Sequence, residues 1–404
     1  MDINRTNAPT DAPPERGSRD VGTLIIGAGQ AGLATAHLLS RAGHDCLVVD
    51  GVRRVGDGWR HQYDSLTLFT PNGVNGLPGQ PFPGPRWDYP SKDEVADYLE
   101  GYADRLGLPL QLATLVTHLG AEGTGFRAET SQGLLRADSV VIATGPHGRI
   151  PSVPACAAEL DPGILQLHSS EYRRPGQLSD GPVLVVGAAH SGCDIALELA
   201  ASHPTILAGR DTGQIPVTWG SWVSRLAVAV LTRVQRHVLT RGTPIGRRQR
   251  PQVLAHGGPM LRVKNADLAR AGVERRTSRV VGADRGRPVL ADGTVLDVAS
   301  VIWATGFRHD FSWLDLPVLD DSGWPREYRG IAEDVSGVYF CGLAYQYAFS
   351  SMLLHGVGRD AGYIVDHILA GQHGSTLPQE DREWNGTGSP EPDGTRTARS
   401  GHTR

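Results

Sequence analysis

The chain has 404 residues, a formal net charge of −4 at pH 7 and 40% hydrophobic residues. Its length predicts about two or three domains, and its small net charge excludes a general electrostatic attraction to nucleic acid. The cysteines, at positions 46, 156, 193 and 341, form no C-x-x-C pair. This spacing argues against a dithiol redox centre and against a zinc site of the usual kind, so we expect no metal. Reduced thiols are typical of a cytoplasmic protein, which is the location we expect.

Both ends of the chain are rich in proline, charged and small polar residues. This composition predicts disordered tails over residues 1–20 and 373–404. The first tail has no apolar core, so we do not expect a signal peptide. The sequence also lacks an apolar run of about 18 residues, so we expect no segment that spans a membrane.

The first structured segment has the pattern of a dinucleotide-binding unit. An apolar run over 21–26 predicts a buried strand, the turn GAGQAG (27–32) and an alanine-rich helix follow, and a second strand over 46–49 ends in Asp50. In such a unit the helix N-terminus holds the pyrophosphate and the acid accepts from a ribose hydroxyl, which predicts bound FAD or NAD. The expected contacts are Gly27, Gly29, Gln30, Ala31, Gly32, Asp50 and Gly51.

A helix and a hairpin are predicted next. Residues 91–106 repeat apolar side chains at helical spacing and begin with a capping box formed by Ser91 and Glu94. Two hairpin strands are expected over 126–130 and 134–137, before the chain returns to the sheet.

An Ala-Thr-Gly tripeptide closes a predicted strand twice. It follows a strand over 139–143 and, much later, a strand over 301–304. Prolines near residue 150 mark a crossing between domains after the first tripeptide. Small residues fit where a crossing passes close to a cofactor, although an ordinary turn is the alternative. The expected contacts are Thr144, Gly145, Thr305 and Gly306.

A second unit repeats the glycine turn as GAAHSG (187–192), after a strand over 183–186 and before a helix over 191–201. Ala189 replaces the middle glycine, which costs one methyl group of clearance for a pyrophosphate. The hydroxyl of Ser191 is placed to cap the helix. The expected contacts in this turn are Gly187, Ala189, His190, Ser191 and Gly192.

The residue that follows the next strand, over 205–208, distinguishes the two units. Counting 18 residues on from Gly32 gives Asp50, whereas counting 18 on from Gly192 gives Arg210. An arginine at this position suits a 2′-phosphate because its planar fork donates two hydrogen bonds. We therefore expect NADP in the second unit with Arg210 as a contact, and a solvated surface arginine is the alternative.

Residues 219–250 contain seven arginines and no acidic residue. Apolar residues from Trp222 to Val238 repeat there at helical spacing. We expect a cap helix over the cofactor cleft with this stripe buried, and its arginines would also favour an acidic substrate. A basic amphipathic helix that lies on an anionic membrane is the alternative.

The last predicted elements are a strand over 337–341 and a helix that begins just after Ser351. We expect Gly356 and Gly358 to interrupt this helix before a further helical stretch over 359–370. If a flavin lies at the helix start, the positive end of the helix would stabilise the reduced ring, so Ser351 is a further expected contact.

These segments together resemble the flavin-containing monooxygenases, most closely the bacterial branch similar to the plant YUCCA enzymes. The likeness extends over residues 20–372 and adds Gly58 and Trp59 to the expected FAD contacts. The segments that show the likeness are GDGWRHQYDSLTLFTP (56–71), HSSEYRRP (168–175), VIWATGF (301–307) and SSMLLHGVGRDA (350–361).

The sequence also departs from the family pattern. Tyr172 rather than a tryptophan follows His168, which argues against the Baeyer–Villiger relatives. We interpret both residues as inter-domain structure on the NADP side rather than as acid–base groups. Pro71, with Asn72 beside it, stands where animal-type members place an asparagine next to the flavin.

The resemblance implies an α/β fold with two Rossmann-like dinucleotide-binding domains, the second inserted in the first. The expected FAD domain comprises residues 21–150 and 285–372, and the NADP domain comprises 151–284 with the insertion at about 219–250.

It also implies that NADPH reduces FAD, that dioxygen adds to the reduced flavin as a hydroperoxyflavin, and that one oxygen atom goes to nitrogen or sulfur of a small molecule. A YUCCA-like oxidative decarboxylation of a keto acid is the other outcome. The cofactor carries this chemistry, so we assign no catalytic residue.

Two other functions remain open at this point. One is an NADPH-consuming flavin oxidase or reductase that releases hydrogen peroxide. The other is a non-oxygenating nucleotide-binding protein in which Ala189 disables the second site. The expected partners are a small-molecule substrate and dioxygen, and the sequence leaves a homodimer open.

Overall fold

The computed structural model describes residues 18–146, 148, 150–215, 219–256 and 259–372. The expected C-terminal tail and residues 1–17 of the N-terminal tail lie outside the described residues. Strand β1 begins at Arg19 and pairs with β6 from its first residue. The first strand therefore starts two residues earlier than the tail prediction allowed, because its backbone joins the sheet before its apolar run begins.

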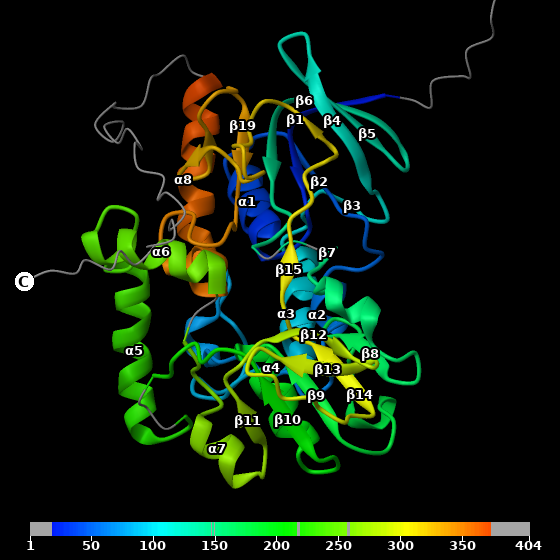
Figure 1. Ribbon diagram of the computed structural model, residues 1–404. Coiled ribbons are helices and arrows are strands. Elements are labelled where there is room, and N and C mark those ends of the chain that lie inside the picture. Colours follow the sequence, from blue (N-terminus) through cyan, green and yellow to red (C-terminus); the bar gives the residue numbers. More distant parts are fainter. Residues whose placement is uncertain (1–17, 147, 149, 216–218, 257–258, 373–404) are drawn as a thin grey trace, which may run out of the picture.

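A ten-stranded sheet forms the upper half of the molecule in Figure 1. Five neighbouring strands form a continuous parallel block, in the order β19-β6-β1-β2-β3. The expected hairpin is confirmed as β5 and the first part of β6, which pair antiparallel from Phe126 and Ala137 to Thr130 and Gly133. The strand expected separately over 139–143 is continuous with that part in β6, and β4, which was not predicted, pairs antiparallel with β5. The bounds are β1 (Arg19–Ile26), β2 (Cys46–Val49), β3 (Leu110–Gln111), β4 (Val116–Glu122), β5 (Gly125–Thr130), β6 (Gly133–Ile142), β16 (Leu314–Asp315), β17 (Glu327–Tyr328), β18 (Ile331–Ala332) and β19 (Val338–Phe340).

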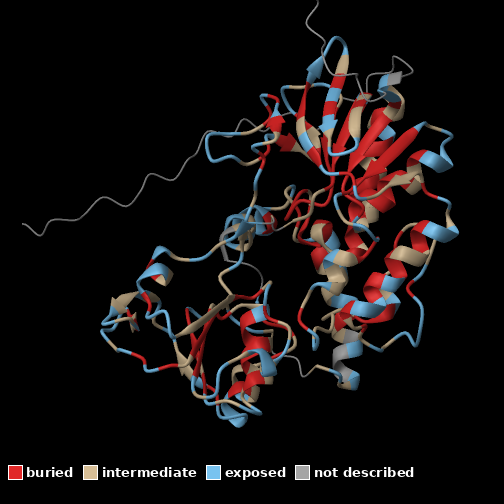
Figure 2. Ribbon diagram, turned by 90° about the vertical axis from the view of Figure 1, so that its right-hand side faces the viewer, coloured by how far each residue is buried: buried red, intermediate tan, exposed pale blue. Residues whose placement is uncertain are grey.

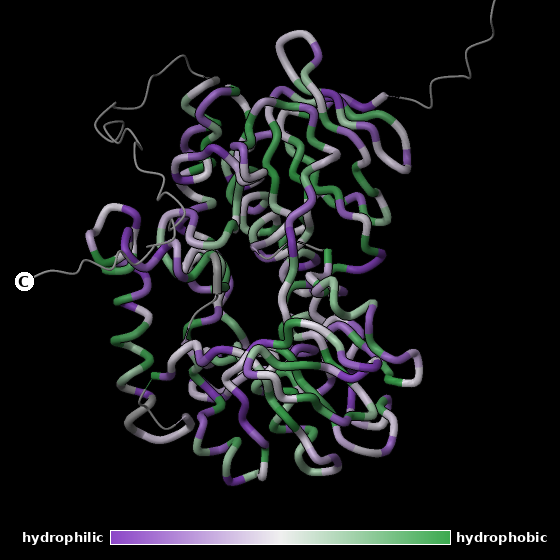
Figure 3. Tube along the Cα trace, in the orientation of Figure 1, coloured by the Kyte–Doolittle hydropathy of each residue, from purple (hydrophilic) through white to green (hydrophobic). Residues whose placement is uncertain are grey.

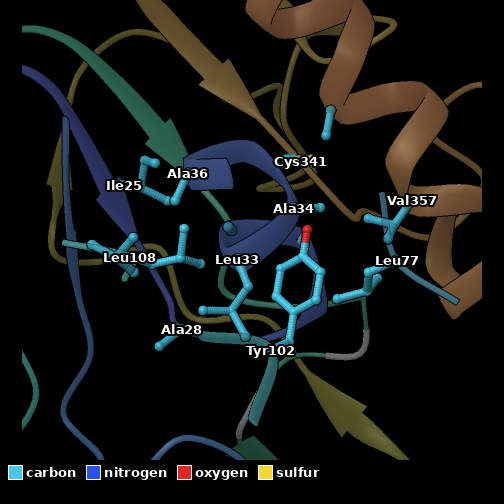
Figure 4. Close-up of a cluster of buried hydrophobic side chains, with 14 of the residues drawn as sticks. Ile25, Ala28, Leu33, Ala34, Ala36, Leu77, Tyr102, Leu108, Cys341 and Val357 are labelled. Atoms are coloured by element: carbon cyan, nitrogen blue, oxygen red, sulfur yellow. The ribbon is translucent and has the colours of Figure 1, made fainter. Parts of the chain in front are cut away.

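Helices α1 (Gln30–Arg41), α3 (Lys92–Arg105) and α8 (Leu354–Gln372) pack together on one face of this sheet. Tyr102 of α3 lies among Leu33, Leu77 and Val357 in Figure 4, and its hydroxyl donates to the carbonyl oxygen of Pro78 (2.7 Å). The expected capping box starts α3: the Ser91 N–H donates to the Glu94 carboxylate (2.8 Å), and the Glu94 N–H donates to the Ser91 hydroxyl (3.3 Å).

A second, wholly parallel sheet forms the lower half, in the order β11-β10-β9-β14-β8. Its three central strands, β10, β9 and β14, are largely buried in Figure 2 and apolar in Figure 3, as expected for a sheet covered on both faces, whereas the edge strands β8 and β11 are partly exposed. The bounds are β8 (Leu165–His168), β9 (Val183–Val186), β10 (Thr205–Ala208), β11 (Glu274–Arg276), β14 (Ser300–Trp303), α4 (His190–Leu199), α7 (Asn265–Arg270) and the hairpin β12 (Val280–Asp284) and β13 (Arg287–Leu290).

The two sheets place their strands in the same relative order. In the first sheet β1, which precedes the glycine turn, lies between β2 and β6. In the second sheet β9, which precedes the other glycine turn, lies between β10 and β14. β6 and β14 are the two strands that lead into an Ala-Thr-Gly tripeptide. This repetition confirms the predicted α/β class with two Rossmann-like units. The glycine turns consequently lie at equivalent edges of the two sheets.

The chain crosses between the halves through two short paired strands, β7 (Ile150–Pro151) and β15 (Phe307–Arg308). The first crossing lies where the prolines indicated it. We expected the chain to return to the FAD domain at residue 285. This was wrong, because β14 pairs with β8 and β9 of the second sheet. The chain therefore remains in the second unit until about residue 304. It crosses back to the first unit only after the second Ala-Thr-Gly tripeptide.

The insertion consists of α5 (Trp222–His237) and α6 (Pro244–His256), which lie to the left in Figure 1. The expected burial of the stripe was wrong for several of its residues, since Trp222 is 78% exposed and Val230 is 57% exposed. Among the side chains of α5 whose burial is described, Val228 and Gln235 are buried, on the other side of the helix. No helix among the described residues is long and apolar enough to cross a membrane.

Helix α8 also differs from the sequence prediction, because it runs without a break through Gly356 and Gly358. A Cβ atom on Gly356 would lie 1.9 Å from the carbonyl oxygen of Ser350, and one on Gly358 would lie 2.6 Å from the ring of Pro78. These glycines therefore permit close packing rather than ending the helix.

Candidate dinucleotide sites

The first glycine turn joins β1 to α1 and is tightly packed at both ends. Gly27 has φ +115°, and a Cβ atom there would lie 2.4 Å from the carbonyl oxygen of Ala143. A Cβ atom on Gly32 would lie 1.8 Å from the carbonyl oxygen of Gly27. Glycine alone fits these two positions, which lets strand, turn and helix approach as closely as a dinucleotide-binding unit requires.

The middle of the same turn is open. A Cβ atom on Gly29 would meet no other heavy atom within 4 Å. Gly29 is the N-cap of α1, and no side chain caps this end. The first amide groups of α1 and the positive end of its dipole are therefore available to a pyrophosphate. This combination fits the phosphates of a dinucleotide.

Asp50 is fixed against this turn by its own carboxylate. The N–H of Ala28 donates to Oδ2 (2.8 Å), and the N–H of Val52 donates to Oδ1 (3.1 Å). Asp50 is buried, whereas the adjacent Gly51 is exposed beside Leu115. The structure thus brings the predicted acid next to the turn, where a ribose hydroxyl would reach it.

The second turn repeats this packing closely. Gly187 has φ +108°, and a Cβ atom there would lie 2.2 Å from the carbonyl oxygen of Ala304. A Cβ atom on Gly192 would lie 1.7 Å from the carbonyl oxygen of Gly187. Ala304 therefore packs against Gly187 as Ala143 packs against Gly27 in the first unit. The alanine of each Ala-Thr-Gly tripeptide thus lies directly against the first glycine of the corresponding turn.

Ala189 occupies the N-cap of α4 without backbone strain. Its φ is −89°, against −84° for Gly29 in the first unit, and an alanine adopts this conformation freely. The cap prediction for Ser191 was wrong, because α4 begins at His190 and no side chain caps it. Ser191 is exposed on the first turn of α4.

Arg210 lies one residue farther along than the residue count suggested. The N–H of Gly27 donates to the carbonyl oxygen of Val49, and the N–H of Gly187 donates to that of Ala208, both at 2.8 Å. Measured from these bonds, the residue level with Asp50 is Gly209, and the exposed Arg210 follows it. The second unit therefore has no acid at the ribose position and an arginine next to it.

Arg275, which the sequence analysis did not single out, holds this loop. Its guanidinium donates to the carbonyl oxygens of Leu207 (3.1 Å) and Gly209 (2.6 Å). Burial lowers the pKa of Arg275 below its ordinary value. Nothing in the sequence marks it apart from the many other arginines, because its role depends on strand β11 lying beside β10.

The two Ala-Thr-Gly tripeptides end in open glycines, since a Cβ atom on Gly145 or Gly306 would meet nothing within 4 Å. Thr144 is partly buried beside the first turn. Thr305 donates from its hydroxyl to the carbonyl oxygen of Ser152 in the crossing. Small residues thus leave room at both sheet edges.

His168 connects the second tripeptide to the start of the inserted unit. Its Nε2 is hydrogen-bonded to the carbonyl oxygen of Gly306 (3.0 Å), and burial lowers its pKa. Tyr172 is fully buried and donates to Glu198 of α4 (2.8 Å). These contacts agree with the interpretation of both residues as structural.

The segment over 56–71 connects the two units. It contains α2 (Asp57–Arg60), in which Gly58 is exposed. Trp59 of α2 packs against the hydrophobic cluster that includes residues of α1, α3 and α8. Farther along, the hydroxyl of Tyr63 donates to Asp194 of α4 (3.1 Å), which also forms an ion pair with Arg262 (3.0 Å).

The same segment reaches the second glycine turn. Phe69 stacks on the imidazole of His190, with ring centroids 5.5 Å apart. Burial lowers the pKa of His190, which favours a neutral ring. The segment over 56–71 therefore contains two expected FAD contacts, Gly58 and Trp59, and also touches His190, an expected NADP contact. Nothing in the sequence indicated the pairing of Phe69 with His190.

Ser351 is brought close to the first turn, but its hydroxyl is used locally. It accepts from the N–H groups of Tyr347 and Ala348, both at 3.0 Å, and closes the turn of the 3-10 helix Phe349–Met352. The side-chain amide of Gln30 donates to the carbonyl oxygen of Met352 (3.0 Å). The segment before α8 therefore lies against the start of α1.

Other chemistry is absent from the described part of the chain. No group of three or more metal-ligating side chains exists there. All four cysteines are buried and free, and burial raises the pKa of Cys193 and that of Cys341 to about 12. The thiols are therefore poor nucleophiles at neutral pH.

Comparisons with known proteins agree with this geometry. The pyridine nucleotide-disulphide oxidoreductase family matches residues 24–242. An uncharacterized CzcO-like oxidoreductase from Geobacillus kaustophilus is 37% identical over 359 residues, which cover 86% of this chain and 98% of the relative.

Two further relatives are flavin monooxygenases or related enzymes by name. The probable indole-3-pyruvate monooxygenase YUCCA9 of Arabidopsis thaliana is 26% identical, over 86% of this chain and 88% of its own. The structure of a flavin-containing monooxygenase from Stenotrophomonas maltophilia is 26% identical, covers 88% of this chain and 99% of its own, and superposes with a TM-score of 0.65.

Proteins of these families use FAD and NADPH, which confirms the expected cofactors. The resemblance to the flavin-containing monooxygenases, with bacterial and YUCCA relatives, is confirmed as well. The chain belongs to the pyridine nucleotide-disulphide oxidoreductase family, and within it to the oxidoreductases of the flavin monooxygenase type.

Proposed function

We propose that this protein is an NADPH-dependent FAD monooxygenase that transfers one atom of dioxygen to a small-molecule substrate. FAD binds at the first glycine turn and NADPH at the second. When bound, FAD accepts a hydride from NADPH and activates dioxygen. The acceptor atom is nitrogen or sulfur, or the transfer drives oxidative decarboxylation of a keto acid. A plant relative is by name a probable indole-3-pyruvate monooxygenase, and indole-3-pyruvate is a keto acid. The cytoplasmic location expected from the cysteines is part of this proposal.

The contrast between the two units carries the proposal. Both have the same turn packing, but Asp50 faces the first turn while Gly209 and Arg210 stand at the second. An acid suits the ribose of FAD, whereas it would repel a 2′-phosphate. A glycine followed by an arginine leaves space for that phosphate and supplies a donor with a fixed positive charge.

The residues of the chain position and enclose the two cofactors. Gln30 joins the first turn to the segment before α8, and Tyr63 and Phe69 join the segment over 56–71 to α4. These contacts support two dinucleotides that meet between the sheets. The buried cysteines argue against transfer of the electrons to a protein dithiol, which supports an external acceptor.

The relaxed conformation of Ala189 counts against the alternative in which the second site is disabled. The experiment that tests the proposal mixes the purified yellow protein with NADPH without oxygen and then admits oxygen. We expect bleaching, then recovery of the flavin colour, and in the presence of substrate a loss of NADPH matched by product. Equal amounts of NADPH consumed and peroxide released with every substrate tried would instead identify an oxidase.

A further inference from the structure

Helix α5 turns one side toward solvent. Among its side chains whose burial is described, the exposed ones recur at helical spacing along that side. They are Trp222, Arg225, Ala229, Val230, Arg233, Arg236 and His237, and this set is termed the outer face of α5. Val228 and Gln235, each 3% exposed, lie on the opposite side. Figure 1 shows α5 at the outer edge of the molecule.

The outer face combines large apolar side chains with positive charge. Trp222 is 78% exposed and Val230 is 57% exposed. A single exposed apolar residue is ordinary on a protein surface. Here an indole and an aliphatic side chain share one face with three arginines, and burying them would be favourable.

The positive charge around this face is uncompensated by nearby acids. No acidic residue occurs between Asp211 and Asp267, whereas this span contains eight arginines and one lysine. None of the three arginines of the outer face forms an ion pair with a described carboxylate. The chain as a whole has a net charge of −4, so the positive charge is a local property of the insertion.

Helix α6 continues this surface composition. Its exposed residues are Pro244, Ile245, Arg247, Arg248, Gln249, Pro251 and Gln252. Ile245 is 56% exposed. Two consecutive helices thus expose arginines and apolar side chains with no acid among them.

The insertion is held firmly on the protein. Thr240 forms an antiparallel bridge with Ala348, and the guanidinium of Arg241 forms a buried ion pair with Glu327 (2.7 Å). The guanidinium of Arg359 on α8 donates to the carbonyl oxygen of Arg236 (3.0 Å). The outer face is therefore formed before any partner arrives, and docking costs little ordering of the chain.

The composition of the outer face favours one kind of partner. A second copy of this chain would bring like charges together across a two-fold axis. A nucleic acid would pair with the arginines but offers no apolar interior to Val230. The core of a protein–protein interface is depleted of charged residues, whereas Arg233 lies on the same stripe as Trp222 and Val230.

An anionic bilayer surface meets both requirements of this face. Lipid phosphates accept hydrogen bonds from guanidinium groups, and the apolar stems of arginines lie along the boundary between headgroups and acyl chains. Tryptophan is enriched at that depth, and aliphatic side chains enter it from interfacial helices.

We infer that the outer face of α5, together with the exposed side chains of α6, docks this protein on a bilayer that contains anionic lipids. The helices lie in the plane of the surface, so the contact is peripheral. The inference goes beyond the proposed function and does not depend on it. It takes up the second interpretation of residues 219–250, which the exposure of Trp222 and Val230 now favours over a buried stripe.

Sedimentation of the purified flavoprotein with lipid vesicles tests the inference. At low salt we expect it to sediment with vesicles of equal parts phosphatidylglycerol and phosphatidylcholine, and to remain in the supernatant with phosphatidylcholine alone. Salt at about 0.5 M should release most of the bound protein, because it shortens the range of the electrostatic attraction to about 4 Å.

Two pairs of matched variants locate the contact. Arg233→Gln should lower the partition coefficient about fivefold, whereas Arg270→Gln, at an exposed arginine of α7, should leave it unchanged. Val230→Ser should lower it about three- to tenfold. Val281→Ser is its control, because Val281 on β12 is 58% exposed, nearly the same as Val230.

Fluorescence gives a readout of depth. Lipids brominated in their acyl chains should quench part of the tryptophan emission of the wild type. In Trp222→Phe this part of the quenching should be lost. Flavin content and bleaching by NADPH in solution should stay the same in all these variants, so vesicle binding and the proposed function fail independently of each other.

Four results would overturn the inference. They are no sedimentation with the anionic vesicles at low salt, equal binding to phosphatidylcholine alone, equal losses in both members of either variant pair, and equal quenching in wild type and Trp222→Phe. A wild-type dimer that Trp222→Phe dissociates in analytical ultracentrifugation would instead assign the outer face to a second copy of the chain, and would overturn it as well.

Discussion

Gly209 occupies, in the second unit, the place that Asp50 occupies in the first. Each is the residue directly after the strand whose last carbonyl oxygen accepts from the first glycine of the turn. The Asp50 carboxylate accepts from the N–H of Ala28, whereas a Cβ atom on Gly209 would lie 3.4 Å from the corresponding nitrogen of Ala188. One site therefore contains a fixed acid, and the other contains space with Arg210 beside it.

The first prediction concerns Arg210. Arg210→Gln is expected to raise the KM for NADPH by about 10- to 100-fold, because a charged hydrogen bond to phosphate contributes about 1.5–3 kcal/mol. The KM for NADH should change less than about threefold. Steady-state or anaerobic reduction kinetics with both nucleotides measure this ratio.

Arg270→Gln is the control, because Arg270 is an exposed arginine of the same unit whose visible partner is Asp267. It should leave both values near those of the wild type. An equal rise for NADPH and NADH in Arg210→Gln would mean that the arginine does not contact a 2′-phosphate.

The second prediction concerns Asp50. Asp50→Ala removes the acceptor for the Ala28 and Val52 amides and for the ribose, so FAD should bind about 10- to 100-fold more weakly. The protein should be purified with less flavin, measured as the ratio of flavin to protein absorbance. Full flavin content with an unchanged dissociation constant would remove Asp50 from the site.

The third prediction contrasts two small residues of the second turn. Gly192→Ala places a methyl group against the carbonyl oxygen of Gly187 and should cost about 3 kcal/mol of unfolding free energy. Ala189→Gly adds no contact at the N-cap and should change stability by less than about 1 kcal/mol. Denaturant unfolding of both variants measures the difference, and similar losses would mean that the turn packing is not as described.

The fourth prediction concerns pH. Burial, helped by the charges of Arg236 and Arg359, lowers the pKa of His355 to about 4. The unfolded chain binds a proton at this histidine near its ordinary pKa of 6.5. Between these values the unfolded state holds more protons, so the free energy of unfolding falls as the pH drops from 6.5 to 4.

His355→Leu should remove up to about 3 kcal/mol of that loss, since one pKa unit corresponds to about 1.4 kcal/mol. Both ring nitrogens are buried without partners, so the substitution breaks no hydrogen bond. Denaturant unfolding at several pH values tests this. Parallel pH profiles for wild type and variant would show that His355 is not buried in its neutral form.

The sequence predicted the strands of both units well. Strands over 46–49, 183–186 and 205–208 lie where short apolar runs placed them, because a strand buried on both faces needs an unbroken apolar run. The glycine turns were recognised for a similar reason, since their residue types follow from local backbone geometry.

The predictions that were wrong concern features that depend on contacts between distant segments of the chain. Membership of β14 in the second sheet requires pairing with β8 and β9, which no local pattern encodes. On α5 the apolar repeat identified a helix but not the buried side, because Gln235 rather than Trp222 faces the protein. The buried ion pair between Arg241 and Glu327 was likewise not predictable, because its two residues come from separate segments.

Anaerobic reduction tests the central claim most directly. The protein is titrated with NADPH and, separately, with NADH in the absence of oxygen, and the flavin absorbance is followed. The two-site account predicts that NADPH bleaches the flavin completely and reaches its half-maximal rate at a lower concentration than NADH does. A yellow protein that NADPH does not bleach, or that both nucleotides bleach with the same concentration dependence, would contradict it.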